Sequence, residues 1–150
     1  MRLLGGSHMV KILFVCHGNI CRSPMAEFIF KDLIKKEGLE DKFEVSSLAL
    51  SDEESGNDIY YLAKEELDKH HIPYTKRKAR RFTLNDYDYY DQIYIMDESN
   101  KRLINRIVQD RDGKIKMLNG IIADPWYSGD FDTAFKQIKE GCLNILKENI

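Results

Sequence analysis

Residues 10–24 read VKILFVCHGNICRSP, and this stretch decides the fold. Residues 10–15 form a short, nearly continuous apolar run, which is typical of a strand buried on both faces of a sheet. The run leads directly into a loop with a turn-forming Gly-Asn pair. From residue 24 to 36 apolar side chains recur at helical spacing, and Gly38 marks the expected end of that helix. The stretch therefore predicts a strand, a tight loop and a helix, with Cys16 where the strand ends.

The rest of the chain alternates between expected strands and expected helices. Further strands are predicted at residues 43–47, 92–96 and 114–118. Further helices are predicted at residues 59–70, 99–109 and 131–147. Residues 51–58 and the segment ADPWYSGD at 123–130 are predicted as loops. This alternation indicates an α/β fold, with a parallel sheet covered by helices on both faces. Ligands of such sheets bind beyond the carboxyl ends of the strands, where the first strand delivers Cys16.

Composition is that of an ordinary globular domain. A chain of 150 residues has room for one core, and we assign residues 9–150 to a single domain. Residues 1–8, MRLLGGSH, have the character of an expression-tag remnant and are set aside. A pI of about 6.1 gives no global attraction to nucleic acid or to membranes. No apolar run is long enough to cross a bilayer, so we expect a soluble protein. Three cysteines do not suggest a disulfide framework, so we expect the protein to be cytoplasmic.

The loop at residues 16–24 has the composition of a cup for an oxyanion. Gly18 and Asn19 tolerate positive φ, so the loop can curl with its N–H groups, that of His17 included, converging on one point. The helix that follows aims its dipole and its free N–H groups into the same cup. Arg22 adds a planar guanidinium that matches two phosphate oxygens. We expect the cup to bind dianionic phosphate and similar oxyanions such as vanadate and sulfate.

Cys16 is the predicted nucleophile of this loop. The positive field of the cup favours its thiolate, because cysteines at helix N-termini near cations have pKa values of about 3.5–7.5. Ser23 is positioned to donate a hydrogen bond to the sulfur. The competing interpretation is a buried structural cysteine beside a surface arginine. The whole nine-residue string between a strand and a helix favours the phosphate site.

Transfer of a phosphoryl group to sulfur also needs a proton donor for the leaving oxygen, and Asp124 is the candidate. Pro125 restricts Asp124 to an extended backbone, which would fix the direction of the carboxylate. Trp126 and Tyr127 follow directly and are placed to wall the entrance. An Asp-Pro turn that opens the last helix explains the same residues, and spacing alone does not decide between the two interpretations.

Three segments occur together and in order: VCHGNICRSPMAE at residues 15–27, MDESN at 96–100 and DPWYSGDF at 124–131. With them the chain resembles the low-molecular-weight protein tyrosine phosphatases over residues 10–150. The resemblance implies a single-domain, four-stranded parallel sheet of the flavodoxin-like, phosphotyrosine phosphatase I type. It also implies hydrolysis of phosphotyrosine in proteins or peptides, and of aryl phosphate monoesters. The reaction would pass through a phosphocysteine intermediate, with no metal and no cofactor.

The resemblance also implies roles for individual residues. Cys16 is the nucleophile and Arg22 binds the phosphate. Asp124 acts first as general acid and then as the base that activates water. Ser23 supports the thiolate, and Asn19 maintains the shape of the loop.

Three positions of the site bear on specificity and regulation. Glu53 stands where family members usually carry an aromatic side chain against the phosphotyrosine ring. It suggests an acidic rim that disfavours acidic residues flanking the phosphotyrosine, or only a solvated acidic surface. Ile20 stands where protein arginine phosphatases carry threonine, and its apolar side chain favours phosphotyrosine. Cys21 matches the family's second loop cysteine, which forms a reversible disulfide with the nucleophile.

The sequence disfavours several alternative functions. Arsenate reductases of this fold need a further cysteine pair, which the chain lacks between Cys21 and Cys142. A phosphate-binding module without turnover would lack the nucleophile or the acid, and both are present. The basic run at residues 76–81 is predicted as a solvated surface loop rather than a docking site. The spacing of His70 and His71 is not that of a convincing metal site, and we expect a monomer or a weak homo-oligomer.

Overall fold

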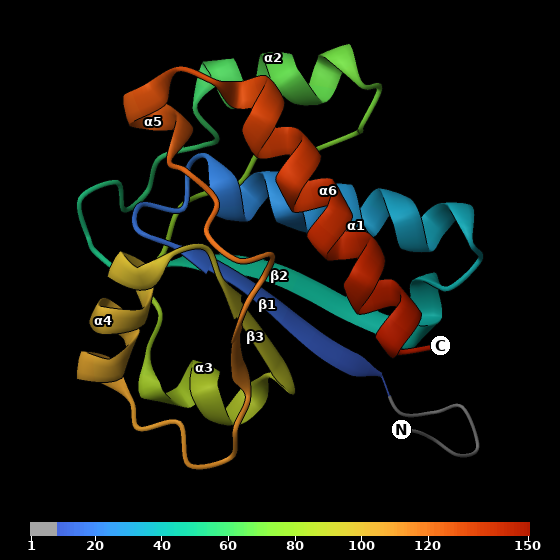
Figure 1. The fold of residues 1–150 in the computed structure, drawn as a ribbon. Coiled ribbons are helices and arrows are strands. Elements are labelled where there is room, and N and C mark those ends of the chain that lie inside the picture. Colours follow the sequence, from blue (N-terminus) through green and yellow to red (C-terminus); the bar gives the residue numbers. More distant parts are fainter. Residues whose placement is uncertain (1–8) are drawn as a thin grey trace.

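A computed structural model describes residues 9–150 of the chain (Figure 1). Its centre is a four-stranded parallel sheet in the order β2-β1-β3-β4. The strands are Val10–Cys16 (β1), Phe43–Ala49 (β2), Gln92–Ile95 (β3) and Ile115–Met117 (β4). The predicted α/β fold with a parallel sheet is confirmed. The tag remnant predicted at residues 1–8 lies outside the described residues.

Helices cover both faces of this sheet (Figure 1). One face carries the helices α1 (Arg22–Lys36), α2 (Tyr61–Lys69) and α6 (Phe131–Glu148). The other face carries α3 (Leu84–Tyr89) and α4 (Glu98–Ile107). Two short elements complete the fold, namely a 3-10 turn at Glu40–Lys42 and the helix α5 (Pro125–Ser128). None of the helices within residues 9–150 combines the length and the apolarity that crossing a membrane requires.

Alternate side chains of β1 enter two different hydrophobic cores. Ile12 and Phe14 pack in the core beneath α1 and α6, whereas Leu13 and Val15 pack in the core beneath α3 and α4. All four side chains are fully buried. A strand buried on both faces has no polar face, which is why residues 10–15 read as one apolar run.

Two local expectations were wrong. No helix was expected between residues 70 and 92, where α3 lies, and residues 123–130 were expected to form a loop although they contain α5. Both helices are too short for apolar periodicity to reveal, since α3 has six residues and α5 has four. The bounds of the other predicted elements agree with the structure to within two residues.

The carboxyl end of β1 is a topological switch point. β1 lies between β2 and β3, so the connections from the centre of the sheet run toward opposite edges. Crevices at such points are the usual ligand sites of parallel sheets. Cys16 is the last residue of β1 and pairs with Ala49 at the end of β2. The loop after β1, the loop after β2 and α5 gather at this end of the sheet (Figure 1).

Candidate active site

The loop that follows β1 folds around the sulfur of Cys16. The backbone nitrogens of Asn19 and Ser23 lie 3.3 Å and 3.4 Å from Cys16 Sγ, and the Ser23 hydroxyl lies 3.1 Å from it. Asn19 has a φ of 62°, in the left-handed region, whereas Gly18 keeps a negative φ. The loop therefore curls as expected, with its turn at Asn19, and it aims donors at a sulfur atom suited to carry negative charge.

Buried hydrogen bonds hold the loop from beneath. The fully buried Asn19 donates through Nδ2 to Ser23 Oγ at 2.8 Å and to Ser47 Oγ at 3.0 Å. Ser47 in turn donates to Glu27 Oε1 at 2.7 Å. Asn19 and Ser23 thus lie behind the sulfur and orient the loop. Neither Ser47 nor Glu27 had a predicted role. For Glu27 the sequence does offer a signal, because its charge falls on the side of α1 that is buried.

Arg77 corrects the prediction for the basic run at residues 76–81. Its neighbours Lys76 and Lys78 are exposed, as expected of a solvated loop. The Arg77 guanidinium instead turns inward, and its Nη2 donates to the backbone oxygen of Asn19 at 2.6 Å and to the Asn19 side-chain oxygen. Burial lowers the pKa of Arg77, against the opposing charges of two carboxylates. This contact joins residues that are far apart in sequence, so no local sequence pattern could have predicted it.

Arg22 is buried, at 2% exposure, and is held by several acceptors. Its Nη1 donates to Asp97 Oδ2 at 2.7 Å and to the backbone oxygen of Ile122 at 2.6 Å, while Nη2 lies 3.5 Å from Asp124 Oδ2. Burial acts to lower the pKa of Arg22, but the charges of Cys16 and Asp124 and the hydrogen bond to Asp97 raise it above its ordinary value. Asp97 lies within MDESN and had no predicted role; in the structure it is the charged partner of the guanidinium at hydrogen-bond distance.

Asp124 both caps a helix and faces the cavity. Its Oδ1 accepts a hydrogen bond from the backbone nitrogen of Trp126 at 3.1 Å, which places Asp124 at the N-cap of α5. Its Oδ2 points toward Arg22, and the side chain is 26% exposed. The Asp-Pro pair therefore opens a short helix of its own and not the last helix, which Asp130 caps. The capping role and the exposure to the cavity are compatible, because each uses a different oxygen of one carboxylate.

A cavity of about 150 Å³ opens at the carboxyl end of β1. It brings together most of the residues predicted for the site, and its lining is Cys16, His17, Gly18, Ile20, Cys21, Arg22, Glu53, Glu54, Asp124, Trp126 and Tyr127. Burial raises the pKa of the Cys21 thiol, and the charge of Cys16 adds to this effect. Glu54 was not predicted as a lining residue, although it follows Glu53 directly in sequence.

The rim of the cavity has an acidic side and an aromatic side. On the acidic side, Glu53 Oε2 lies 3.1 Å from His17 Nε2. On the aromatic side, Trp126 packs against Tyr60 with ring centroids 4.7 Å apart, and Tyr127 is 85% exposed. Tyr60 had no predicted role. The cavity thus has an aromatic surface, at Trp126 and Tyr127, although Glu53 does not provide one, and Tyr60 supports Trp126.

These parts define a class of protein. One cavity is lined by a sulfur atom among hydrogen-bond donors, a buried guanidinium and a carboxylate. Cysteine-dependent phosphoryl transfer requires groups of these three kinds. The open parallel sheet places them at its switch point. Fold and site together are those of a cysteine-dependent phosphatase.

Comparisons with known proteins identify the family. The profile of the family "Low molecular weight phosphotyrosine protein phosphatase" matches residues 11–149. The enzyme of that name from Gallus gallus is 36% identical, over 97% of this chain and 99% of its own. The crystal structure of YfkJ from Bacillus subtilis superposes with a TM-score of 0.90 at 35% identity, covering 94% of each chain. The chain belongs to the low molecular weight phosphotyrosine protein phosphatase family, and it is a protein tyrosine phosphatase.

A drosophila arginine phosphatase, DARP, shares the fold. Its crystal structure superposes with a TM-score of 0.83 at 31% identity, covering 93% of this chain and 97% of its own. Proteins with this architecture therefore include an enzyme named for a different phosphorylated residue.

Proposed function

We propose that Cys16, Arg22 and Asp124 carry out the dephosphorylation in two steps. In the first, the Cys16 thiolate attacks phosphorus, the bond from phosphorus to the phenolic oxygen breaks, and Asp124 gives its proton to that oxygen. Arg22 and the loop N–H groups bind the non-bridging oxygens, whose charge the site must neutralise. The products of this step are the free phenol and phosphate bound covalently to sulfur.

The second step releases the phosphate. The Asp124 carboxylate takes a proton from water, the water oxygen attacks phosphorus, and the phosphorus–sulfur bond breaks to return the thiolate. Ser23 Oγ, 3.1 Å from the sulfur, donates a hydrogen bond that stabilises the departing thiolate. Asn19 keeps Ser23 in place through its 2.8 Å hydrogen bond.

A single arrangement supports these roles: Cys16, Arg22 and Asp124 line one cavity. We would measure turnover of a phosphotyrosine peptide by the parent chain, Cys16→Ser and Asp124→Asn. Cys16→Ser should abolish turnover. Asp124→Asn should lower kcat/KM, which reports the first step, by about 10²–10⁴-fold, and by much less for an aryl phosphate whose leaving phenol is strongly acidic. An equal loss of kcat/KM on both substrates would reject Asp124 as the proton donor.

We propose phosphotyrosine rather than phosphoarginine as the preferred substrate. Ile20 lines the cavity with an apolar, branched side chain, which suits the face of an aromatic ring better than a guanidino group. The similarity to an enzyme named as an arginine phosphatase makes the comparison necessary. Parallel assays on phosphotyrosine and phosphoarginine, with Ile20→Thr as the variant, should show a shift toward phosphoarginine in the variant only. Selective turnover of phosphoarginine by the parent chain would overturn the proposal.

Glu53 and Glu54 form an acidic rim, and we infer that it disfavours substrates with acidic flanking residues. Both line the cavity, and Glu54 sits close enough to Gly18 that a Cβ there would lie 3.2 Å from Glu54 Cγ. Phosphopeptides that differ only in acidic or basic flanks should differ in kcat/KM, with the basic peptide preferred. Glu53→Gln should narrow the difference. Equal kcat/KM for the two peptides in the parent chain would leave Glu53 as a solvated surface residue.

The chemistry also favours a reducing compartment such as the cytoplasm. Cys16, Cys21 and Cys142 are all free thiols, and the proposed reaction needs Cys16 reduced. A Cys16–Cys21 disulfide would block turnover reversibly. For the assembly we infer a monomer or a weak homo-oligomer, which light scattering over a range of concentrations would test.

A further inference from the structure

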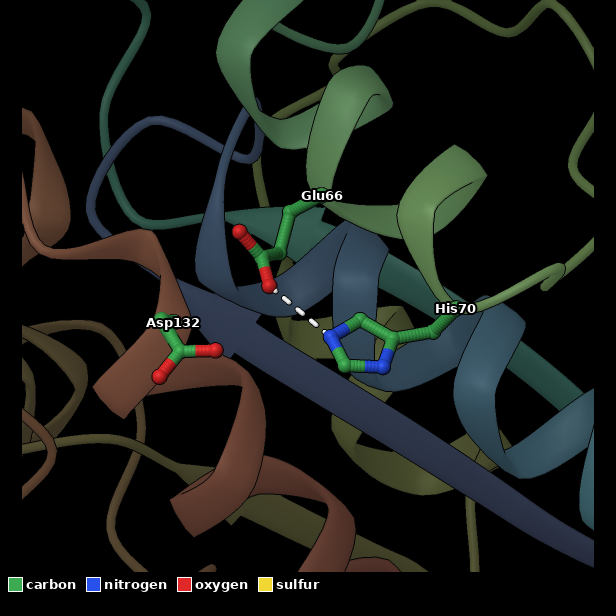
Figure 2. Close-up of side chains that lie close together, drawn as sticks. All are labelled: Glu66, His70 and Asp132. Carbon is green, nitrogen blue, oxygen red and sulfur yellow. Dashed lines mark hydrogen bonds and ion pairs between the residues drawn. The ribbon is translucent and has the colours of Figure 1, made fainter.

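A second cluster of polar side chains lies between α2 and α6 (Figure 2). Glu66 lies on α2, His70 follows one turn later as the C-cap of that helix, and Asp132 lies in the first turn of α6. Glu66 Oε2 is 2.9 Å from His70 Nε2, and one ligand atom of each of the three residues lies within 4.8 Å of the others. Within residues 9–150, this is the one group of three or more His, Cys, Asp or Glu side chains so close together.

The geometry points to a binding site for a divalent transition-metal ion, and we propose that Glu66, His70 and Asp132 bind an ion such as Zn²⁺ there. One imidazole nitrogen and two carboxylate oxygens form a ligand set that zinc and its first-row neighbours accept, with water completing a tetrahedron. The His70–Asp132 combination joins two helices, so the sequence spacing of His70 and His71 did not reveal it.

The histidine is held in position for this role. The imidazole of His70 stacks on the ring of Phe135, with centroids 3.7 Å apart and planes inclined by 7°. Phe135 lies on α6 one turn beyond Asp132, so the same helix that supplies the third ligand also fixes the plane of the ring. Figure 2 shows the Nε2 side of the ring turned toward Glu66. A ligand fixed by packing in this way loses little freedom when it binds an ion.

Only one ligand has to move far. Tetrahedral zinc with bonds of about 2.0–2.1 Å places its ligands roughly 3.3 Å apart. The Glu66 and His70 atoms are 2.9 Å apart, so they need to separate only slightly to reach this spacing, and Glu66 is 6% exposed. Asp132 is 48% exposed, so a change of its rotamer can bring it toward the pair. An open hollow lined by Leu62, Glu66, Lys69 and Asp132 lets solvent and ions reach the cluster.

Two lysines compete with the ion. Lys136 pairs with Asp132 at 3.0 Å, and Lys69 lies 3.5 Å from Glu66 Oε1. Both are exposed by more than half, so each ion pair is weak and easily exchanged for a metal–oxygen bond. A bound ion would tie α2 to the start of α6. It would raise the stability of the fold in proportion to the logarithm of metal concentration above Kd.

Zn²⁺ itself is the probe, in a background in which Cys16→Ser and Cys21→Ser remove the thiols of the cavity. Calorimetric titration and thermal unfolding with and without ZnCl₂ would compare this parent with His70→Gln, Asp132→Asn and His71→Asn. His71 is the matched control, because it is adjacent and exposed. Its φ of 58° is one that asparagine tolerates.

We expect one Zn²⁺ per chain and a higher Tm in the parent and in His71→Asn. His70→Gln and Asp132→Asn should each raise Kd by about tenfold or more and lose the Tm increase. Asp132→Asn should keep the metal-free Tm close to that of the parent, because Asp132 is half exposed. His70→Gln loses the stacking on Phe135, so the Tm increase of each variant is measured from its own metal-free Tm. Absence of binding in the parent, or unchanged affinity in either ligand variant, would overturn the proposal. Equal loss in His71→Asn would also overturn it.

Discussion

The guanidinium of Arg77 donates hydrogen bonds to two oxygens of Asn19, the backbone oxygen at 2.6 Å and the side-chain amide oxygen. Asn19 is the residue whose φ of 62° turns the phosphate loop. Because Arg77 occupies the amide oxygen, the amide nitrogen faces Ser23 and Ser47. Arg77 therefore fixes the hydroxyl beside the Cys16 sulfur through one intervening residue.

Arg77→Lys should lower kcat/KM for a phosphotyrosine peptide by about 10–100-fold. A lysine side chain ends one bond short of Nη2, the nitrogen that makes both hydrogen bonds to Asn19, and the loss of a charge-assisted hydrogen bond costs about 1.5–3 kcal/mol. Steady-state kinetics would measure the effect. Lys78→Ala is the matched control, since Lys78 is exposed in the same run and should leave kcat/KM unchanged. Parental activity in Arg77→Lys would show that the loop holds its shape without this contact.

Asp97→Asn should weaken the binding of inorganic phosphate, seen as a rise of about tenfold in its inhibition constant. The amide keeps an oxygen for the cap of α4, where Asp97 accepts from the backbone nitrogen of Asn100 at 2.7 Å. It removes the charge opposite Arg22, so the guanidinium loses its main partner and its fixed direction. Asp88→Asn breaks an exposed ion pair with Arg111 and serves as the control. If phosphate inhibits Asp97→Asn as it inhibits the parent, Arg22 does not need this carboxylate.

Gly141→Ala should destabilise the protein by about 1–3 kcal/mol, although alanine is the better helix former. A Cβ at Gly141 would lie 2.7 Å from side-chain atoms of Leu118 and 2.9 Å from its backbone oxygen. To avoid this clash, α6 would have to shift away from the segment after β4. The cost of such overpacking outweighs the roughly 1 kcal/mol that the higher helix propensity of alanine contributes. Urea unfolding would measure the difference.

Asn144→Ala separates helix propensity from packing in this experiment. Asn144 is exposed on the same helix, so its replacement should raise stability by a few tenths of a kcal/mol. If Gly141→Ala instead stabilises the protein, α6 can move away from Leu118 at a smaller energetic cost than the close contact indicates.

The phosphate loop was predictable because everything that shapes it is local. The apolar strand, the positive φ of Asn19 and the helix start all lie within residues 10–24. Asp124 was a candidate for a similar reason, since the following proline and aromatic residues mark its segment, although spacing alone left an Asp-Pro turn equally open. Such patterns reveal which residues belong to a site when the residues share one segment.

The residues that hold the phosphate loop in place were not predictable, because they are far from it in sequence and contact it only in the folded structure. Arg77 reaches Asn19 across 58 positions, and Arg22 reaches Ile122 across 100. Nothing in the basic run distinguishes Arg77 from its solvated neighbours; the packing of its segment beside the phosphate loop does. The same holds for Asp132, which approaches Glu66 and His70 only because α6 packs against α2.

Asp86 should make the stability of the protein depend on acid pH. Its carboxylate accepts from Thr83 at 2.8 Å and 2.9 Å and from both terminal nitrogens of Arg80, which secures the start of α3. Burial raises its pKa, but the hydrogen bonds from Arg80 and Thr83 outweigh it and hold the pKa below the ordinary value of 3.8. Because the pKa is lower in the folded state, this stabilisation is complete above pH 3.8. It is lost as the pH falls through the folded pKa.

Asp86→Asn should therefore lower the free energy of unfolding by about 1 kcal/mol at neutral pH, the usual value of a helix cap. Toward about pH 2 the difference in free energy should shrink, because the carboxyl of the parent is then protonated and uncharged, like the amide of the variant. Urea unfolding at both pH values would measure it, with Asp88→Asn as an exposed control on the same helix. A difference that stays constant across this range would mean that the contribution of Asp86 does not depend on its charge.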